Sequence, residues 1–343
     1  MNKRVLPISS LRFVLAFWVV MGHFSPPILR AHQHSLPLFV VRAAVNNTFN
    51  GAAAVIIFFI ISGFCIHFPN RSGLKIRSWR MYFARRYVRI LIPMTVAIAL
   101  SLPLGMRFGL FTDSILWSLL CEEIYYLLYP GLLALRARWG WRKLMAAAWA
   151  LSVLVILTNP RAQYYPSYGP ALNWALGLPC WLLGCRLAER LGSLSALPVS
   201  VGQIWTWRGG VWALSGVTSV LAFHSPIGYP WTLNLFAVFG AYWIEREIRF
   251  YRARGAPKFE GLGEASYSIY LTHPHCIAFV SRLPISRALG PWPVWLSVMV
   301  CCTGFAAFFY RFVERPSHQL ARRLGRATLP QTAPQSLSPT SAP

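Results

Sequence analysis

Long apolar stretches separated by short polar segments recur along almost the whole chain. A helix that crosses the hydrocarbon core of a bilayer needs about 20 mostly apolar residues. The pattern predicts ten such helices, at about residues 7–25, 50–68, 87–105, 114–135, 142–159, 169–188, 210–224, 229–246, 264–281 and 292–312. The seventh is short for a crossing. We therefore expect an all-α integral membrane protein, built as a bundle of about ten transmembrane helices.

The positions of the basic residues predict the orientation of this bundle. Cytoplasmic loops of membrane proteins carry an excess of Lys and Arg. With a cytoplasmic N-terminus, ten crossings place 26 of the 33 Lys and Arg residues on the cytoplasmic side and six on the outer side. Each cytoplasmic segment after the N-terminal one carries more of them than any outer loop. Both termini are therefore expected in the cytoplasm.

The same pattern divides the chain into a polytopic membrane domain, residues 1–318, and a polar cytoplasmic tail, residues 319–343. From about Ala327 the tail is rich in Pro, Ser, Thr and Gln. That composition cannot bury enough apolar surface to fold, so we expect disorder there. The first apolar stretch contains Arg12 and lacks a clear small-residue cleavage site, which favours a retained span over a cleaved signal peptide.

Composition supports the membrane assignment and argues against nucleic-acid binding. The chain is 56% hydrophobic, yet its formal net charge is +24. A nucleic-acid-binding domain of that charge would carry its basic residues on a soluble fold, whereas here they cluster between apolar stretches. The seven cysteines all lie in or beside apolar segments. We expect them to be small buried hydrophobic residues, with neither a disulfide framework nor a metal site.

Arg12 and His23 lie in the first apolar stretch, LRFVLAFWVVMGHF. Eleven residues of helix bring them to within about 20° of one face, about 16 Å apart along the axis. Burying an Arg in a membrane costs about 2.5–3.5 kcal/mol even on the more lenient scale, so it normally faces a partner or a polar cavity. The alternative is that Arg12 reaches the cytoplasmic surface and His23 lies in the outer headgroup layer.

Three arginines, Arg85, Arg86 and Arg89, lie in FARRYVRILIP at the cytoplasmic end of the third predicted helix. Arg89 is a helical neighbour of the other two by spacing. Guanidinium groups match the geometry of phosphate oxygens, which makes these residues candidates for an anion site. The alternative is ordinary cytoplasmic anchoring of the helix.

The fourth predicted helix, WSLLCEEIYYLLYP, contains two glutamates in an apolar span. A polar stripe at helical spacing comprises Ser118, Glu122, Tyr125, Tyr126 and Tyr129. A buried Glu must be paired, hydrogen-bonded or protonated. A functional stripe that faces the interior is therefore favoured over a structural one. Glu123 points to another face, where an Arg could pair with it.

A second polar cluster lies in the ninth predicted helix, in SYSIYLTHPH. Ser266, Tyr270 and His273 fall near one face of this helix. A Ser–His pair is also found in serine hydrolases, but no G-x-S-x-G motif accompanies it here.

Six segments together resemble the acyltransferase-3 family of membrane-bound O-acyltransferases. In chain order they are Arg12-x10-His23, FFIISGF (58–64), Arg86-x-x-Arg89 with Ile90 and Pro93, Trp117-Ser118-Leu119 with Glu122 and Tyr126, SYSIYLTH (266–273), and Glu314-x-Pro316. Bacterial members of this family modify O-antigen, exopolysaccharide, nodulation factors, peptidoglycan and some macrolides. The chain departs from the family in having Ile56 where many members carry a polar residue. It also lacks the extracytoplasmic hydrolase-like domain of some larger members.

The resemblance implies an enzyme of the bacterial inner membrane that transfers an acyl group, with acetyl favoured, from acyl-CoA. The implied acceptor is a hydroxyl group of a carbohydrate or glycolipid, and no permanently bound cofactor or metal is expected. His23 is the implied general base, with Arg12 and Glu122 positioning it or stabilising developing charge; Arg12 could instead bind the donor. The residues implied to bind substrate or acyl-CoA are Arg85, Arg86, Arg89, Trp117, Ser118, Tyr126, Ser266 and His273.

Two other functions are compatible with charged residues inside a membrane bundle. One is a transporter or flippase of an anionic or lipid-linked substrate, although the chain lacks the repeated halves of many transporters. The other is a membrane-embedded binding or sensing protein without turnover. Thioester cleavage by the purified protein would distinguish an enzyme from both.

The basic-residue asymmetry generates a test of topology. Reporter fusions after Arg138 and Lys258 are expected to give a cytoplasmic signal, because these positions follow Arg-rich segments. Fusions near Arg161 and Arg287 are expected to give an exterior signal. A cytoplasmic signal from the Arg161 loop would overturn the ten-crossing arrangement.

Overall fold

The structure is a computed structural model that describes residues 7–27, 47–71, 76, 78–106, 115–191 and 199–324, without the side chain of residue 287. Within these ranges all regular structure is helical, as the sequence predicts. The long helices are α1 (Ile8–His23), α3 (Gly51–His67), α4 (Trp79–Ser101), α5 (Leu116–Thr158), α6 (Gly169–Arg190), α7 (Val201–His224), α8 (Tyr229–Arg254), α9 (Ser266–Arg282), α11 (Pro291–Phe309) and α12 (Arg315–Leu324). Shorter elements are η1 (Phe68–Asn70), η2 (Tyr165–Tyr168), η3 (Glu260–Ala265), α10 (Ile285–Ala288) and η4 (Tyr310–Glu314).

Each of the ten predicted stretches contains helix, but several boundaries were wrong. The fourth and fifth stretches form α5, which is broken at Gly140, where φ is 71° and ψ is 169°. That positive φ is one that glycine adopts readily. The short seventh stretch is a 24-residue helix that begins at Val201. Its start is fixed by a capping box, in which Ser200 and Gln203 each accept a hydrogen bond from the other's backbone N–H.

Three helical segments of the described chain are long and apolar enough to cross a membrane: Gly51–Asn70, Leu116–Thr158 and Pro291–Leu324. The apolar helix α1 is shorter. The number of crossings and the side on which the termini lie therefore stay predictions. The predicted domain boundary at residue 318 falls inside α12, and residues 325–343 of the predicted tail lie outside the described residues.

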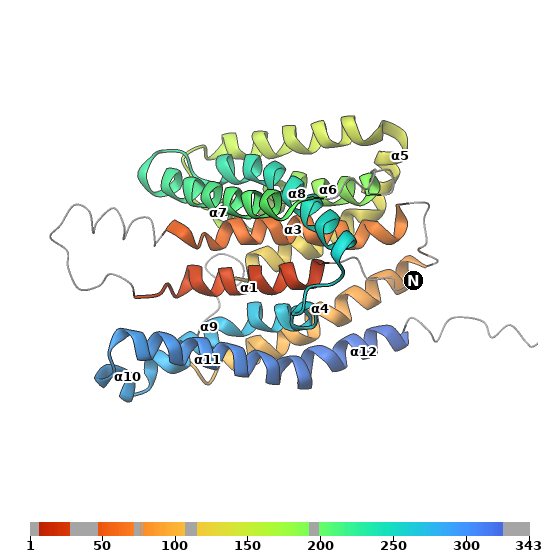
Figure 1. The fold of residues 1–343 in the computed structure, drawn as a ribbon. Helices are drawn as coiled ribbons and strands as arrows, with labels where there is room; N and C mark the ends of the chain where they lie inside the picture. The colour runs from red at the N-terminus through yellow and green to blue at the C-terminus, as the bar shows by residue number, and fades with distance from the viewer. Residues whose placement is uncertain are drawn as a thin grey trace, which may run out of the picture.

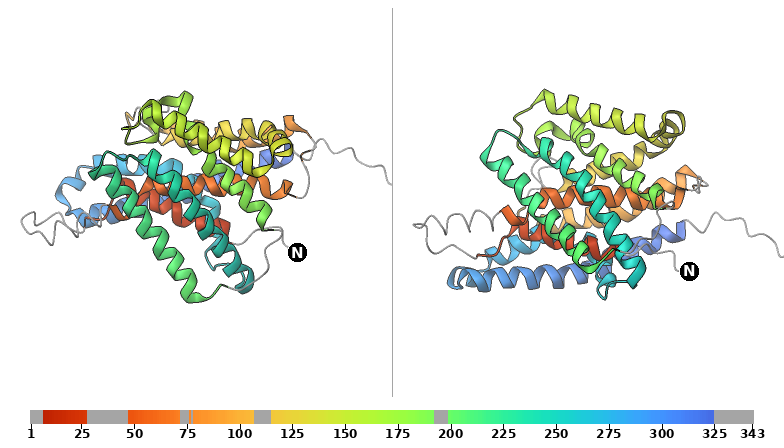
Figure 2. Two further views of the ribbon diagram at one scale, coloured as in Figure 1. Left: turned by 90° about the horizontal axis from the view of Figure 1, so that it is seen from above. Right: turned by 45° about the horizontal axis from the view of Figure 1, so that its top comes forward.

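The helices form an elongated bundle in which most run along one direction, while α7 and α8 cross the others obliquely (Figures 1 and 2). Helix α3 lies in the middle and packs against α1, α6 and α8. Helices α9, α11 and α12, drawn in shades of blue, lie along one side of the bundle (Figure 1). The start of α1 and the end of α12 lie at the same end of the bundle (Figure 1), which is the arrangement that an even number of crossings would give.

A close contact joins α3 to α6 through two glycines. A Cβ atom on Gly63 would lie 2.0 Å from the carbonyl oxygen of Trp181, and one on Gly184 would lie 1.9 Å from that of Ile60. Small residues allow the backbones of membrane helices to approach in this way. Because α3 carries part of the polar pocket described below, this contact fixes one wall of it.

Two carboxylates hold the starts of α1 and α9, the half-buried Glu260 and the buried Glu314. Glu260 of η3 accepts hydrogen bonds from the backbone N–H groups of Ser9 and Ser10, both at 3.0 Å. A carboxylate at a helix N-terminus pairs with otherwise unbonded donors and with the helix dipole. Glu314 binds the backbone N–H and the hydroxyl of Ser268 in the first turn of α9 at 3.0 and 2.6 Å.

The α3–α6 contact generates a stability prediction. Gly184→Ala would force the two helix backbones apart, and overpacking of this kind typically costs about 1–3 kcal/mol. Gly209→Ala in α7 is the matched control, because a Cβ atom there meets nothing within 4 Å and should stabilise the helix by about 0.5–1 kcal/mol. Thermal unfolding in detergent should show a lower Tm than that of the wild-type protein for Gly184→Ala and not for Gly209→Ala. Equal Tm changes in both would contradict this packing.

Candidate active site

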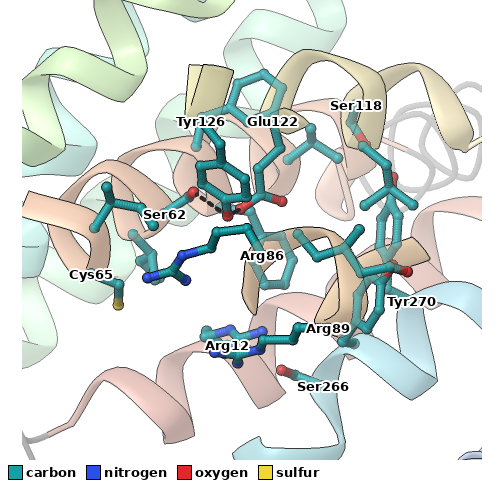
Figure 3. Close-up of a pocket in the computed structure, with 18 of the residues that line it drawn as sticks. Arg12, Ser62, Cys65, Arg86, Arg89, Ser118, Glu122, Tyr126, Ser266 and Tyr270 are labelled. Carbon is teal, nitrogen blue, oxygen red and sulfur yellow. Dashed lines mark hydrogen bonds between the residues drawn. The ribbon is translucent and has the colours of Figure 1, made fainter. Parts of the chain in front are cut away.

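A polar pocket lies inside the bundle and is lined by side chains from α1, α3, α4, α5, α9 and η4 (Figure 3). About 900 Å³ of space within it, including its open mouth, is free of protein atoms. Its polar and charged lining residues are Arg12, Ser62, Cys65, Arg86, Arg89, Ser118, Glu122, Tyr126, Ser266, Tyr267, Tyr270 and Glu314.

Three guanidinium groups reach this pocket, from Arg12, Arg86 and Arg89 (Figure 3). None of them forms an ion pair within 4.0 Å with a carboxylate of the described residues. Arg89 donates instead to the imidazole of His318, at 3.0 Å, and Arg86 faces the rings of Tyr82 and Tyr126. With two carboxylates against three guanidinium groups, the pocket suits an anionic ligand.

Glu122 is held at the pocket by a line of hydrogen bonds that crosses three helices. The hydroxyl of Tyr126 donates to its carboxylate (Figure 3). The hydroxyl of Tyr126 also lies 3.1 Å from the hydroxyl of Ser62 on α3. The Ser62 hydroxyl in turn accepts a hydrogen bond from the indole N–H of Trp181 on α6, at 3.2 Å. No sequence pattern pointed to Trp181, and Ser62 stood out only as part of the segment FFIISGF.

Glu314 is a second carboxylate of the site that the sequence marked only by its motif. It is 1% exposed and lines the pocket. One of its oxygens accepts both bonds from Ser268, and the other lies 3.6 Å from the imidazole of His318. The helix N-terminus of α9 thus holds this carboxylate in place beside Arg89.

Tyr270 and Ser118 close one end of the pocket. Their hydroxyl oxygens are 2.7 Å apart, and each also lies within hydrogen-bond distance of the carbonyl oxygen of Ile115, at 3.0 Å for Tyr270 and 3.1 Å for Ser118. The Tyr270 ring lies 6.0 Å from the ring of His273. Tyr270 therefore lies between the pocket and the histidines beyond it.

His23 and His273 do not line the pocket, but the structure brings them together. Their ring centroids are 5.0 Å apart. The Nδ1 atom of His23 lies 2.9 Å from the carbonyl oxygen of Val19, and its side chain is exposed. Arg12 and His23, which were predicted to share one face of the helix, therefore lie in two different places: Arg12 lines the pocket, and His23 lies beside His273.

Other predicted site residues lie elsewhere. Arg85 is exposed and outside the pocket. Trp117 also lies outside its lining and packs against the rings of Phe59 and Tyr165. Ser266, in contrast, lines the pocket.

The predicted polar stripe of α5 is divided between the pocket and neighbouring helices. Ser118, Glu122 and Tyr126 face the pocket. Tyr125 instead donates to the carbonyl oxygen of Trp174, and Tyr129 bonds the buried imidazole of His67. The Arg partner suggested for Glu123 is absent within the described residues, where neither of its carboxylate oxygens has a hydrogen-bond partner.

The cysteines are mostly buried, as expected, and Cys65 is the exception. Cys121, Cys180, Cys185, Cys276 and Cys302 are buried, and Cys301 is half-buried. Cys65 is exposed and lines the pocket. The apolar residues around each cysteine in the sequence could not show that Cys65 lies at a polar pocket and the buried cysteines in the core.

Comparison with known proteins gives one family and two named relatives. The family profile of an acyltransferase domain, acyltransferase-3, matches residues 8–311. An acyltransferase of Streptomyces mycarofaciens, MdmB, is 26% identical, with 96% of each chain covered. Nodulation protein 10 of Rhizobium leguminosarum bv. viciae is 24% identical over 80% of this chain and 86% of its own. No solved structure matches the chain.

Proposed function

The chain belongs to the acyltransferase-3 family, and from this membership we propose that it transfers an acyl group, acetyl in the first instance, from acyl-CoA to a hydroxyl group of a carbohydrate or glycolipid. The observation that carries the proposal is the pocket with three guanidinium groups and no carboxylate partner for them among the described residues. Such a pocket suits the phosphates of coenzyme A.

The donor would enter from the arginine end of the bundle. Arg86 and Arg89 lie one helical turn apart on α4 and both reach the pocket. Arg12 faces them from α1. It is about 16 Å along the helix from His23, so it is too far away to position that imidazole. We assign it to the donor, as a phosphate ligand or as a stabiliser of charge that develops on the thioester.

The acceptor hydroxyl would be activated at the other end, by His23. A backbone carbonyl only accepts hydrogen bonds, so the contact with Val19 requires that Nδ1 carries the proton. The lone pair of Nε2 is then free to take a proton from the hydroxyl. The oxygen bonds to the acyl carbon, the carbon–sulfur bond breaks, and coenzyme A leaves as its thiolate.

Glu122 fits the role of a fixed negative charge in the donor pocket. The line of hydrogen bonds through Tyr126, Ser62 and Trp181 holds it in one place. A preorganised charge needs no rearrangement during the reaction. We propose a multi-pass protein of the bacterial inner membrane, with its arginine end in the cytoplasm where acyl-CoA is found.

The donor assignment predicts the effect of removing two charges. Replacing Arg86 and Arg89 together with Ala should raise the Kd for acetyl-CoA at least about tenfold, because hydrogen bonds between charged groups are lost. Arg85→Ala is the control, since Arg85 lies on the same helix but outside the pocket. Binding to purified protein would be measured by calorimetry. Unchanged affinity in the double variant would reduce these arginines to topological anchors.

The acceptor assignment predicts a different loss. His23→Ala should bind acetyl-CoA normally and lose about 10²–10⁴-fold in acyl transfer, the usual contribution of a general base. His224→Ala, at an exposed helix end, should retain activity. Labelled product in membranes at matched protein level, together with thioester cleavage, is the measurement. Near-normal product from His23→Ala would remove His23 from catalysis, and intact acetyl-CoA with the wild-type protein would favour a transporter.

A further inference from the structure

His273 has a buried nitrogen with no partner among the described residues. Its side chain is 0% exposed. Its Nδ1 atom lies 2.7 Å from the carbonyl oxygen of Tyr270, whereas its Nε2 atom makes no hydrogen bond. A buried polar atom left without a partner costs free energy, so such atoms are rare in folded proteins. This nitrogen therefore needs an explanation.

The hydrogen bonds fix which nitrogen of each ring carries the proton. In both His23 and His273, Nδ1 faces a backbone carbonyl, which can only accept. Both neutral rings therefore carry the proton on Nδ1 and a lone pair on Nε2. Two lone pairs cannot hydrogen-bond to each other. In the resting protein the two Nε2 atoms are therefore both acceptors, and neither ring offers the other a donor.

A proton placed on His23 removes this mismatch. Once Nε2 of His23 is protonated, it becomes a donor, and the buried Nε2 of His273 is an acceptor without a competing partner. Ring centroids 5.0 Å apart are close enough for a nitrogen of one ring to bond a nitrogen of the other. The exposed side of the pair belongs to His23, so the acceptor would approach His23 and not His273.

We propose that His273 is a positioning residue for the acyl transfer, which accepts a hydrogen bond from His23 after His23 has taken the proton of the acceptor hydroxyl. This inference rests on the proposed function. The hydroxyl O–H bond breaks and its proton moves to Nε2 of His23, while the oxygen forms the ester bond and the thiolate leaves with the carbon–sulfur electron pair. The bond to His273 stabilises the imidazolium until its proton passes to water at the exposed His23.

The neighbouring His275 provides a contrast within the same helix. Its Nε2 atom lies 2.8 Å from the carbonyl oxygen of Ala97 on α4. It is therefore turned toward a different helix and holds α9 to α4. His275→Gln, which keeps an amide donor at that position, should leave acyl transfer unchanged and serves as the control.

Two substitutions of His273 separate the positioning role from a structural one. His273→Asn places its amide where Nδ1 lies, so it keeps the bond to Tyr270 and removes Nε2. His273→Gln places its amide where Nε2 lies and supplies an acceptor oxygen there. Asn should lower kcat by about ten- to hundredfold, the usual worth of a hydrogen bond to a charged group. Gln should retain most of kcat, and the KM for acetyl-CoA should be unchanged in both.

The assay follows labelled acetyl from acetyl-CoA into product in membranes of the native host, with protein level and Tm matched. If His273→Asn retains as much acyl transfer activity as His273→Gln, or more, then His273 acts through its bond to Tyr270 or has no role in transfer. Either result would overturn the inference. If the wild-type protein consumes no acetyl-CoA, the proposed function itself fails, which is a separate result.

A measurement on the wild-type protein tests the same inference without a variant. Histidine labelled with ¹⁵N shows by NMR which ring nitrogen carries the proton, and the His273 signal can be assigned through its correlations with Thr272. The inference requires the Nδ1–H form for His273 in the resting protein. A proton on Nε2 would overturn it, because no acceptor would then remain for His23.

Discussion

Charged side chains in this molecule must avoid hydrocarbon, and that constraint organises the bundle. Arg12, Arg86, Arg89, Glu122 and Glu314 come from three helices and the η4 segment and meet in one pocket. Each would be costly on a lipid-facing surface. The tight α3–α6 contact and the two carboxylates that hold the starts of α1 and α9 keep the pocket walls in register. These five charged side chains are therefore concentrated in one interior pocket.

The arginine pocket and the pair of His23 and His273 form two chemically different ends of the proposed site. The pocket end carries guanidinium groups and suits phosphate, whereas the far end carries two imidazoles and suits a hydroxyl group. Tyr270 and Ser118 lie between them, bonded to each other and to the backbone of Ile115. Their hydroxyls are the polar atoms that a thioester would meet on passing from one end to the other. Separate ends fit a reaction whose donor and acceptor lie on opposite sides of a membrane.

The sequence predicted the helices and singled out several residues that line the pocket, because apolar length and helical spacing are local properties. It failed where partners lie far apart in the chain. Helical spacing placed Tyr129 in the polar stripe of Glu122, but its hydroxyl bonds the imidazole of His67 on α3 and does not reach the pocket. Trp181 and His318 carry no local signal, since only the packing of α6 and α12 brings them to Ser62 and Arg89.

Transfer across the bilayer between the two ends is the central claim, and membrane vesicles of opposite orientation test it most directly. Labelled acetyl-CoA, which does not cross a bilayer, would be added to inverted and to right-side-out vesicles from the native host. Our account predicts alkali-labile label on a glycan or lipid in inverted vesicles, where the cytoplasmic face is outside, and little in right-side-out ones. Label confined to right-side-out vesicles, or absent from both, would contradict it.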